Sequence, residues 1–315
     1  MRIDRRRTLA GIAATALAPA ALAQEKKEPP AIPGPDPATR TPAFKAPAGS
    51  VDTHCHIFGP VSKYPYVANR PYTPPEAPLD MFRALHAKIG VERAVIVNAT
   101  THGTDHRVVV DAIAQSGGAY RGVVNIDESI SDSELEALEK AGVRACRFVF
   151  LARLGGKPDF SRVKRAAERV KGLNWHVDLY FEPTLLEALA PELQALPVPY
   201  VIDHMGAIKA VDGLDQPAFK ALLALQARDE KCWIKISGPE RMSASGPSFA
   251  DAVPFARKIV ETAPDRVLWG TDWPHPNVPV MPNDGDLVDL VPQYAPDEQV
   301  RRKLLVDNPA RLFRF

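Results

Sequence analysis

Short apolar runs rich in β-branched residues recur along the chain, separated by longer stretches with helical spacing. The apolar runs occupy residues 51–54, 94–98, 120–124, 143–148, 176–181, 200–203, 232–236 and 267–269. Apolar residues three or four positions apart occupy 78–88, 106–116, 132–141, 161–171, 183–196, 216–229 and 249–263. Eight strands alternating with helices predict a (β/α)8 barrel, with a doubly wound open sheet as the alternative. Residues 300–315 are predicted to close the barrel as a final helical segment.

Several of the predicted boundaries carry the chemistry of helix ends. Ser131 stands three residues before Glu134, which is a capping-box pattern, and Gly90 and Gly142 follow helical stretches where a left-handed residue commonly ends a helix. No Gly-x-Gly-x-x-Gly motif follows the first apolar run. This absence weighs against the dinucleotide-binding version of the open sheet.

The first 49 residues are predicted to lie outside the barrel domain, which we place at 50–315. Arginines at positions 5–7 precede an apolar run at 9–22 that ends in Ala-Leu-Ala, a pattern typical of a twin-arginine export signal cleaved after residue 23. The alternative is an uncleaved amphipathic N-terminus. The apolar run is too short for a membrane span, so we expect a periplasmic or extracellular protein with no membrane contact after cleavage. Residues 24–49 contain seven prolines and predict an extended, mostly unpacked leader.

Composition excludes some classes of function. The chain carries a net charge of +1, with 39 basic and 38 acidic residues, and 45% of its residues are hydrophobic. Without the four arginines and one aspartate of residues 1–23, 35 basic and 37 acidic residues remain, a net charge of −2 that does not favour a nucleic-acid partner. The three cysteines are far apart and are predicted to be buried free thiols. The sequence does not indicate an oligomeric state.

Polar side chains gather at the carboxyl ends of the predicted strands. His54 and His56 alternate with Thr53 and Cys55, so the two imidazoles point to the same face of the first strand. Barrels of this type keep their chemistry at the carboxyl ends of the strands. The other polar groups found at strand ends are Thr100, Arg147, Arg153, Tyr180, His204, Arg241, Asp272 and His275. The sequence therefore predicts one site built from loops that follow different strands.

These motifs in combination resemble those of the amidohydrolase superfamily. The resemblance rests on His-x-His at 54–56, Asp-His-Met-Gly at 203–206 and Gly-Thr-Asp-Trp-Pro-His-Pro at 270–276. Further motifs are similar to those of 2-pyrone-4,6-dicarboxylate lactonases: Tyr-Thr-Pro at 72–74, His-Gly at 102–103, Tyr-Phe-Glu at 180–182, Pro-Glu-Arg at 239–241 and Leu-Leu-Val-Asp-Asn-Pro at 304–309. The resemblance covers residues 51–313. It implies a distorted (β/α)8 barrel that adds water to a cyclic ester, often without a metal.

The same resemblance implies roles for individual residues. Asp272 corresponds to the general base, and His54, His56 and His204 correspond to groups around the scissile carbonyl. The residues that correspond to the substrate-binding set are Tyr72, Arg147, Arg153, Tyr180, Arg241 and His275, to which the position of Thr100 adds one more candidate. The residue types fit this chemistry, because a carboxylate can take a proton from water, imidazoles can donate to an oxyanion, and arginines bind carboxylates through paired hydrogen bonds. The arginines also have a structural interpretation, as members of ion pairs on the barrel rim.

The metal requirement is left open by the residues. His54, His56, His204 and Asp272 form a set that could hold one zinc ion. A dinuclear site of this superfamily normally has a bridging lysine at the end of the fourth strand, where this chain has Arg147, so two metals are not expected. We favour no metal over one.

The sequence thus predicts a hydrolase of a small anionic lactone that acts through water activated by Asp272. One alternative is a mononuclear metal-dependent amidohydrolase or decarboxylase of a small cyclic acid. The other alternative is a periplasmic binding protein that kept the arginines and lost catalysis. The combination of Asp272 with three histidines argues against this alternative.

Overall fold

Eight parallel strands form the barrel and are joined in the order in which they occur in the chain. The computed structural model describes residues 28–315, and its strands are β1 (Val51–Cys55), β2 (Arg93–Val97), β3 (Tyr120–Asn125), β4 (Val143–Phe150), β5 (His176–Phe181), β6 (Tyr200–Ile202), β7 (Cys232–Lys235) and β8 (Val267–Leu268). The two ends of the sheet meet where Thr53 N donates to Trp269 O (2.9 Å) and Asp272 N donates to His54 O (2.8 Å). The predicted eight-stranded barrel is confirmed.

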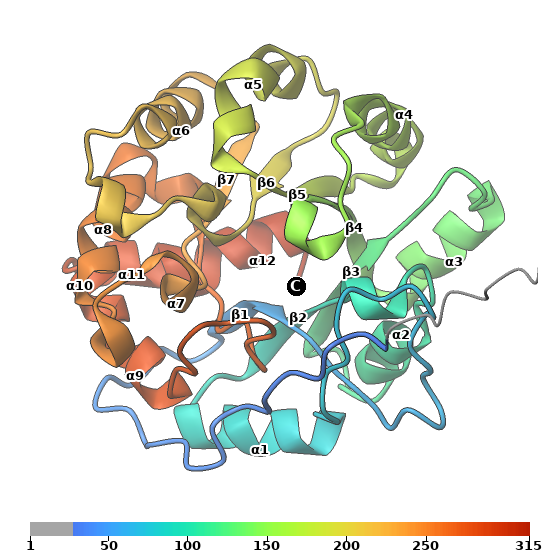
Figure 1. The fold of residues 1–315 in the computed structure, drawn as a ribbon, viewed down its shortest axis with the longest axis horizontal. Helices are drawn as coiled ribbons and strands as arrows, with labels where there is room; N and C mark the ends of the chain where they lie inside the picture. Colours follow the sequence, from blue (N-terminus) through green and yellow to red (C-terminus); the bar gives the residue numbers. More distant parts are fainter. Residues whose placement is uncertain (1–27) are drawn as a thin grey trace, which may run out of the picture.

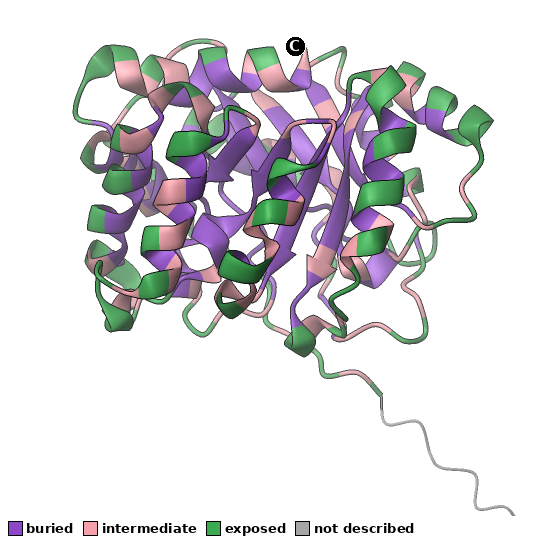
Figure 2. Cartoon of the chain, turned by 90° about the horizontal axis from the view of Figure 1, so that it is seen from above, coloured by how far each residue is buried: buried purple, intermediate pink, exposed green. Residues whose placement is uncertain are grey.

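Helices between consecutive strands form a ring around the sheet, as Figure 1 shows. They are α1 (Leu79–Ile89), α2 (Arg107–Ala114), α3 (Asp132–Ala141), α4 (Phe160–Val170), α5 (Leu186–Gln194), α6 (Pro217–Arg228) and α8 (Val253–Thr262), with a short α7 (Pro239–Met242) after β7. Their outward faces are exposed and the strands inside are buried (Figure 2). Within residues 28–315, no helix combines the length and the apolar character needed to cross a membrane.

The predicted helix ends are present, with two differences inside the predicted helices. The capping box of Ser131 and Glu134 forms at the start of α3, and Gly90 and Gly142 end α1 and α3 with positive φ. The predicted helix 183–196 begins as a 3-10 turn, and α5 follows it. The predicted final segment divides into α11 (Glu298–Arg302), a π-helical stretch at Lys303–Asp307 and α12 (Asn308–Phe313), preceded by α9 (Asp284–Asp289) and α10 (Val291–Tyr294).

The core has an outer layer between sheet and helices and an inner layer within the barrel. The inner layer contains Val51, Val95, Val123 and Leu268, all fully buried, together with Phe313 of α12. Because Phe313 packs against residues from the beginnings of strands, α12 covers the amino end of the barrel, as predicted for the final segment.

The leader lies against the barrel. Ile32 N donates to Thr73 O (3.0 Å), and Asn283 accepts a hydrogen bond from Arg40 N (2.9 Å) and donates one to Asp36 Oδ2 (2.8 Å). The prediction of an unpacked segment is therefore wrong for residues 28–49, although they are extended as predicted. Proline lacks an N–H but keeps its carbonyl, so a proline-rich chain can still pair through its other residues. The predicted export signal lies outside the described residues.

Candidate active site

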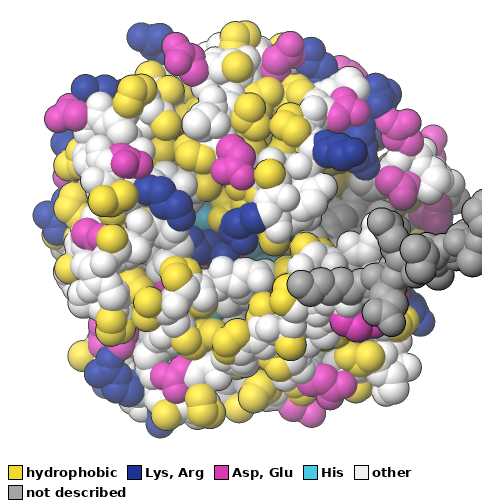
Figure 3. Space-filling view, viewed as in Figure 1, with side chains coloured by type: hydrophobic (Ala, Val, Ile, Leu, Met, Phe, Trp, Pro, Cys, Tyr) yellow, Lys and Arg dark blue, Asp and Glu magenta, His cyan; other side chains and the backbone are white. Residues whose placement is uncertain are grey.

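A cavity opens at the carboxyl ends of the strands. In Figure 3, basic side chains surround the central hollow and histidines are visible at its floor. The lining contains nine of the predicted site residues: His56, Tyr72, Thr100, Arg147, Arg153, Tyr180, His204, Arg241 and Asp272. It also contains Ala99, Leu154, Pro276 and Asn277. The last four lie in loops and had no sequence signal beyond their closeness to predicted positions.

Asp272 lies at the centre of the three predicted histidines. Its Oδ1 atom is 3.7 Å from His54 Nε2, 3.6 Å from His56 Nε2 and 3.9 Å from His204 Nε2. Its Oδ2 atom accepts a hydrogen bond from Arg241 Nε at 2.5 Å. Burial opposes ionisation, but Arg241 and the surrounding histidines together outweigh it and hold the pKa of Asp272 well below its usual range. The carboxylate is thus ionised, with one oxygen fixed and the other turned toward the imidazoles.

The three imidazoles are held from behind by different partners. His56 donates from Nδ1 to Val97 O (2.8 Å), and His204 Nδ1 is 3.0 Å from Ser237 Oγ. Burial lowers the pKa of His204 to about 3 and that of His54 well below its usual value. Both rings are therefore neutral at pH 7 and can donate or accept hydrogen bonds without carrying charge.

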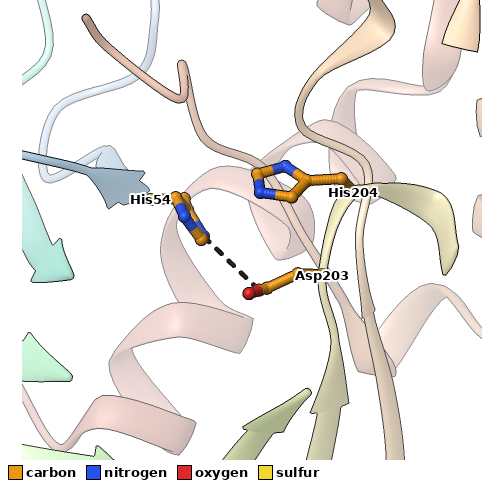
Figure 4. A group of neighbouring side chains, drawn as sticks. All are labelled: His54, Asp203 and His204. Carbon is orange, nitrogen blue, oxygen red and sulfur yellow. Dashed lines mark ion pairs between the residues drawn. The ribbon is translucent and has the colours of Figure 1, made fainter. Parts of the chain in front are cut away.

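A buried network of charges lies beneath the histidines. Lys235 Nζ is 2.5 Å from Asp178 Oδ2 and 3.1 Å from Asp203 Oδ1, and Arg147 Nε donates to Asp203 Oδ2 (2.9 Å). His54 approaches the same Asp203 with Nδ1 at 3.4 Å, and Figure 4 shows His54 with Asp203 and His204. The sequence does not reveal the pairing of Lys235 with Asp178 and Asp203, because charged residues within apolar runs give no indication of their partners across the barrel.

The predicted substrate-binding residues form the upper wall of the cavity. Arg153 donates from Nη2 to Tyr180 Oη (3.3 Å), and the Tyr180 ring meets the His204 ring edge-on with centroids 4.7 Å apart. Burial raises the pKa of Tyr72 to about 12, so its hydroxyl stays protonated as a donor. The structure therefore brings Tyr72, Arg153 and Tyr180 together with the Asp272 centre.

His275 does not line the cavity. It is 1% exposed, with Nδ1 3.3 Å from Glu240 Oε1 and Nε2 3.1 Å from Asp284 Oδ1. Burial opposes its protonation, but the two carboxylates outweigh burial and raise the pKa of His275 to about 10. Because both nitrogens are engaged by carboxylates, this geometry does not support the predicted contact with substrate. The imidazolium instead joins the loop after β8 to α7 and α9.

The residues around Asp272 could hold one divalent cation. His54 Nε2 and Asp272 Oδ1 are buried without hydrogen-bond partners among the described residues, and His54, His56 and Asp272 offer ligand atoms within 4.8 Å of one another. His54 and His204 make a second such group with Asp203. That carboxylate already carries Lys235 and Arg147, so the Asp272 group fits a cation better.

Fold and site together define the class of protein. Residues 51–315 match the amidohydrolase family, to which the chain belongs.

Among named relatives, the chain is 46% identical over 281 residues to the 2-pyrone-4,6-dicarboxylate hydrolase of Comamonas testosteroni, covering 86% of this chain and 92% of that protein. It is 43% identical over 274 residues to the 4-sulfomuconolactone hydrolase of Hydrogenophaga intermedia, covering 86% and 90%. A crystal structure named "probable 2-pyrone-4,6-dicarboxylic acid hydrolase", from Acinetobacter baumannii with citric acid bound, superposes with a TM-score of 0.75 at 27% identity, covering 85% and 100%. These relatives identify the chain as a lactone hydrolase of the amidohydrolase superfamily.

Proposed function

We propose that this enzyme opens a small lactone that carries at least two acidic groups, using water activated by Asp272. The observation that carries the proposal is the free Oδ1 atom of Asp272, which three imidazoles surround at 3.6 to 3.9 Å while Arg241 holds the other oxygen. The named relatives support the substrate class, because one acts on a pyrone dicarboxylate and another on a sulfomuconolactone.

The arginines of the cavity support an anionic substrate. Arg147 uses Nε on Asp203, and its two terminal nitrogens have no hydrogen-bond partner within residues 28–315. Arg153 has no carboxylate within ion-pair distance in the same part of the chain, and donates only to Tyr180. Arg147 is buried and Arg153 is exposed at the cavity mouth, and guanidinium groups bind planar acids through parallel hydrogen bonds. Two incompletely paired arginines therefore favour a substrate with two acidic groups.

The proposed reaction assigns each proton to a residue. Asp272 Oδ1 takes a proton from water as the water oxygen bonds to the lactone carbonyl carbon. Neutral imidazoles donate to the carbonyl oxygen as it gains negative charge in the tetrahedral intermediate. The ring carbon–oxygen bond then breaks, and the proton held by Asp272 passes to the leaving oxygen. The product has a new carboxyl group and a new hydroxyl group, so the atoms of one water are accounted for.

We propose that these steps need no metal. The buried charges near the site already balance, because Arg147, Lys235 and Arg241 face Asp178, Asp203 and Asp272. A divalent cation held by His54, His56, His204 and Asp272 would lower the pKa of a bound water molecule.

A panel of lactones with zero to three carboxylate or sulfonate groups tests the proposal. We expect ring opening, followed by ultraviolet absorbance, for members with two or more acidic groups, and slower turnover as acidic groups are removed. Activity should persist after zinc chelation, and metal analysis should find less than one zinc per chain. Absence of ring opening across the panel, or release of carbon dioxide in its place, would overturn the proposed reaction.

We also propose that the enzyme acts outside the cytoplasm, on the basis of the arginines at 5–7 and the Ala-Leu-Ala sequence at 21–23. Expression in a bacterial host followed by fractionation and N-terminal sequencing tests this. We expect a periplasmic product that begins at Gln24, whereas a cytoplasmic product with residues 1–23 intact would contradict export.

A further inference from the structure

Lys235 is a buried cation in direct contact with one of the site histidines, and the reaction proposed above gives it no role. Its side chain is fully buried, and Nζ lies 2.5 Å from Asp178 Oδ2, 3.1 Å from Asp203 Oδ1 and 3.4 Å from His54 Nδ1. The two carboxylates pair with the ammonium group, which lies beneath His54 as a hydrogen-bond donor.

The contact with His54 depends on which ring nitrogen carries the proton. An ammonium group has three N–H donors and no acceptor, so Lys235 can bond to His54 Nδ1 only if that nitrogen is unprotonated. Asp203 Oδ1 is also 3.4 Å from Nδ1 and would favour the opposite tautomer. However, of these two contacts only the one with Lys235 has hydrogen-bond geometry.

The cavity side of the ring favours the same proton position. His54 Nε2 faces the ionised Oδ1 of Asp272 at 3.7 Å, and both atoms are buried without a hydrogen-bond partner in the described part of the chain. A lone pair on Nε2 would face a carboxylate oxygen unfavourably. An N–H there is attracted to the carboxylate and can bond to it or to a water or substrate oxygen between them.

We propose that Lys235 is a positioning residue that fixes the His54 proton on Nε2, so that His54 enters the cavity as a hydrogen-bond donor. His56 differs at its other nitrogen, because its Nδ1 donates to the backbone carbonyl of Val97. The use of this donor in lactone opening rests on the proposed function, whereas the position of the proton does not.

This arrangement has a consequence for metal binding. A protonated Nε2 cannot act as a ligand, so a cation at the Asp272 group would require the His54 proton to move to Nδ1, toward the Lys235 ammonium. Lys235 therefore disfavours a cation at a site whose side chains otherwise fit one.

Nuclear magnetic resonance of the ¹⁵N-labelled full chain, prepared without metal, tests the proton position directly. Long-range ¹H–¹⁵N spectra distinguish protonated from unprotonated ring nitrogens, and the variant His54→Gln assigns the His54 signals by their loss. We expect a protonated Nε2 and an unprotonated Nδ1 in the unsubstituted protein. A protonated Nδ1 would overturn the proposal even if the enzyme opens lactones rapidly.

A paired substitution tests the role of Lys235. Lys235→Met combined with Asp178→Asn removes one charge of each sign, and Arg147 remains on Asp203. We expect the His54 proton to move to Nδ1 and zinc affinity, measured by competition with a chromophoric chelator, to rise by roughly 10- to 100-fold, the range in which groups behind a ligating histidine act. The matched control is Lys258→Met with Glu261→Gln, which removes an exposed ion pair and should change neither measurement.

The outcomes separate this proposal from the proposed function. Unchanged zinc affinity and an unchanged His54 tautomer in a folded double variant would overturn the role of Lys235. If the double variant does not fold by circular dichroism, the tautomer of the unsubstituted protein decides. Failure of every lactone in the panel with His54 protonated on Nε2 would overturn the proposed function and leave the inference about Lys235 standing.

Discussion

At the scale of single residues, the chemistry depends on the different partners of the two carboxylate oxygens of Asp272. Arg241 occupies Oδ2, and the imidazoles surround Oδ1, so one oxygen is fixed and one can accept a proton. The residue has a φ of 67°, a left-handed conformation that is uncommon outside glycine and is held here by the chain around it. Backbone strain of this kind is concentrated at functional sites and orients the carboxylate before substrate arrives.

The variant Asp272→Asn should lower kcat by roughly 10²- to 10⁴-fold, because an amide cannot take the proton from water. Binding of a dicarboxylate lactone, measured by calorimetry, should be largely retained since the arginines are unchanged. Asp215→Asn, which alters an exposed aspartate paired with Lys220, is the matched control. Equal turnover of the Asp272 variant and its parent would favour a binding protein over an enzyme.

The variant Arg153→Met should raise KM by roughly 10- to 100-fold for a substrate with two acidic groups, the scale of a lost charge-assisted hydrogen bond, with little change in kcat. The same variant should affect a monocarboxylate lactone less. The control is Arg165→Met, which removes an exposed positive charge from α4, where Arg165 pairs with Glu128. Identical KM ratios for the two substrates would show that Arg153 does not bind the second acid.

At the scale of elements, the leader contacts α9 through several side chains, including Asp289, which accepts from Ala43 N and Phe44 N. Asn283 caps α9 by accepting from Gly285 N (3.2 Å), and it also accepts from Arg40 N and donates to Asp36 and Ala38 of the leader. The Asn283 amide therefore links the start of this helix to the leader.

The variant Asn283→Ala should lower the free energy of unfolding by about 1–2 kcal/mol, because it removes a helix cap and leaves leader groups without partners. Urea denaturation followed by circular dichroism measures the change. Thr39→Ala in the same leader removes a side chain that makes no hydrogen bond within residues 28–315 and should stay within about 0.5 kcal/mol of the parent. Similar losses for both variants would mean that Asn283 contributes no specific contact.

Much of the element order could be predicted from the sequence, because each buried strand corresponds to an apolar run. Each amphipathic helix corresponds to apolar residues spaced three or four positions apart. The site was predictable to the extent that its residues follow strands, as His54 and Asp272 do. The pairing of Lys235 with Asp178 and the engagement of His275 by Glu240 depend on which side chains meet across the barrel. Local patterns carry no signal for such contacts, and the packed leader was missed for the same reason.

At the scale of the whole molecule, buried ionisable groups make stability depend on pH from two sides. His204 has a pKa lowered to about 3, so the unfolded chain binds a proton that the folded chain does not as the pH falls below about 6.5. His275 has a pKa raised to about 10, so the folded chain keeps a proton that the unfolded chain loses as the pH rises above about 6.5. Both effects lower stability on moving away from the region near pH 6.5.

The melting temperature should therefore be highest near pH 6.5 and should decline on both sides. Thiols and phenols ionise above about pH 8, so they do not contribute to the decline in melting temperature between about pH 6.5 and 8. In His275→Gln the melting temperature should be lower, and its decline over this pH range should be smaller. Scanning calorimetry of parent and variant across this range measures both effects. If the melting temperatures of parent and variant fall in parallel above about pH 6.5, His275 is not the cause of the alkaline pH dependence.

The helix that covers the amino end of the barrel has a consequence for turnover. Phe313 and the inner layer of valines and leucine fill that end, whereas the cavity opens at the carboxyl ends of the strands. The lactone and the ring-opened acid are therefore expected to pass through the same opening of the cavity. The acid leaves past guanidinium groups and carries one more negative charge than the lactone that entered. We expect the acid to compete with fresh lactone, so that progress curves slow before the lactone is exhausted and added salt relieves the slowing.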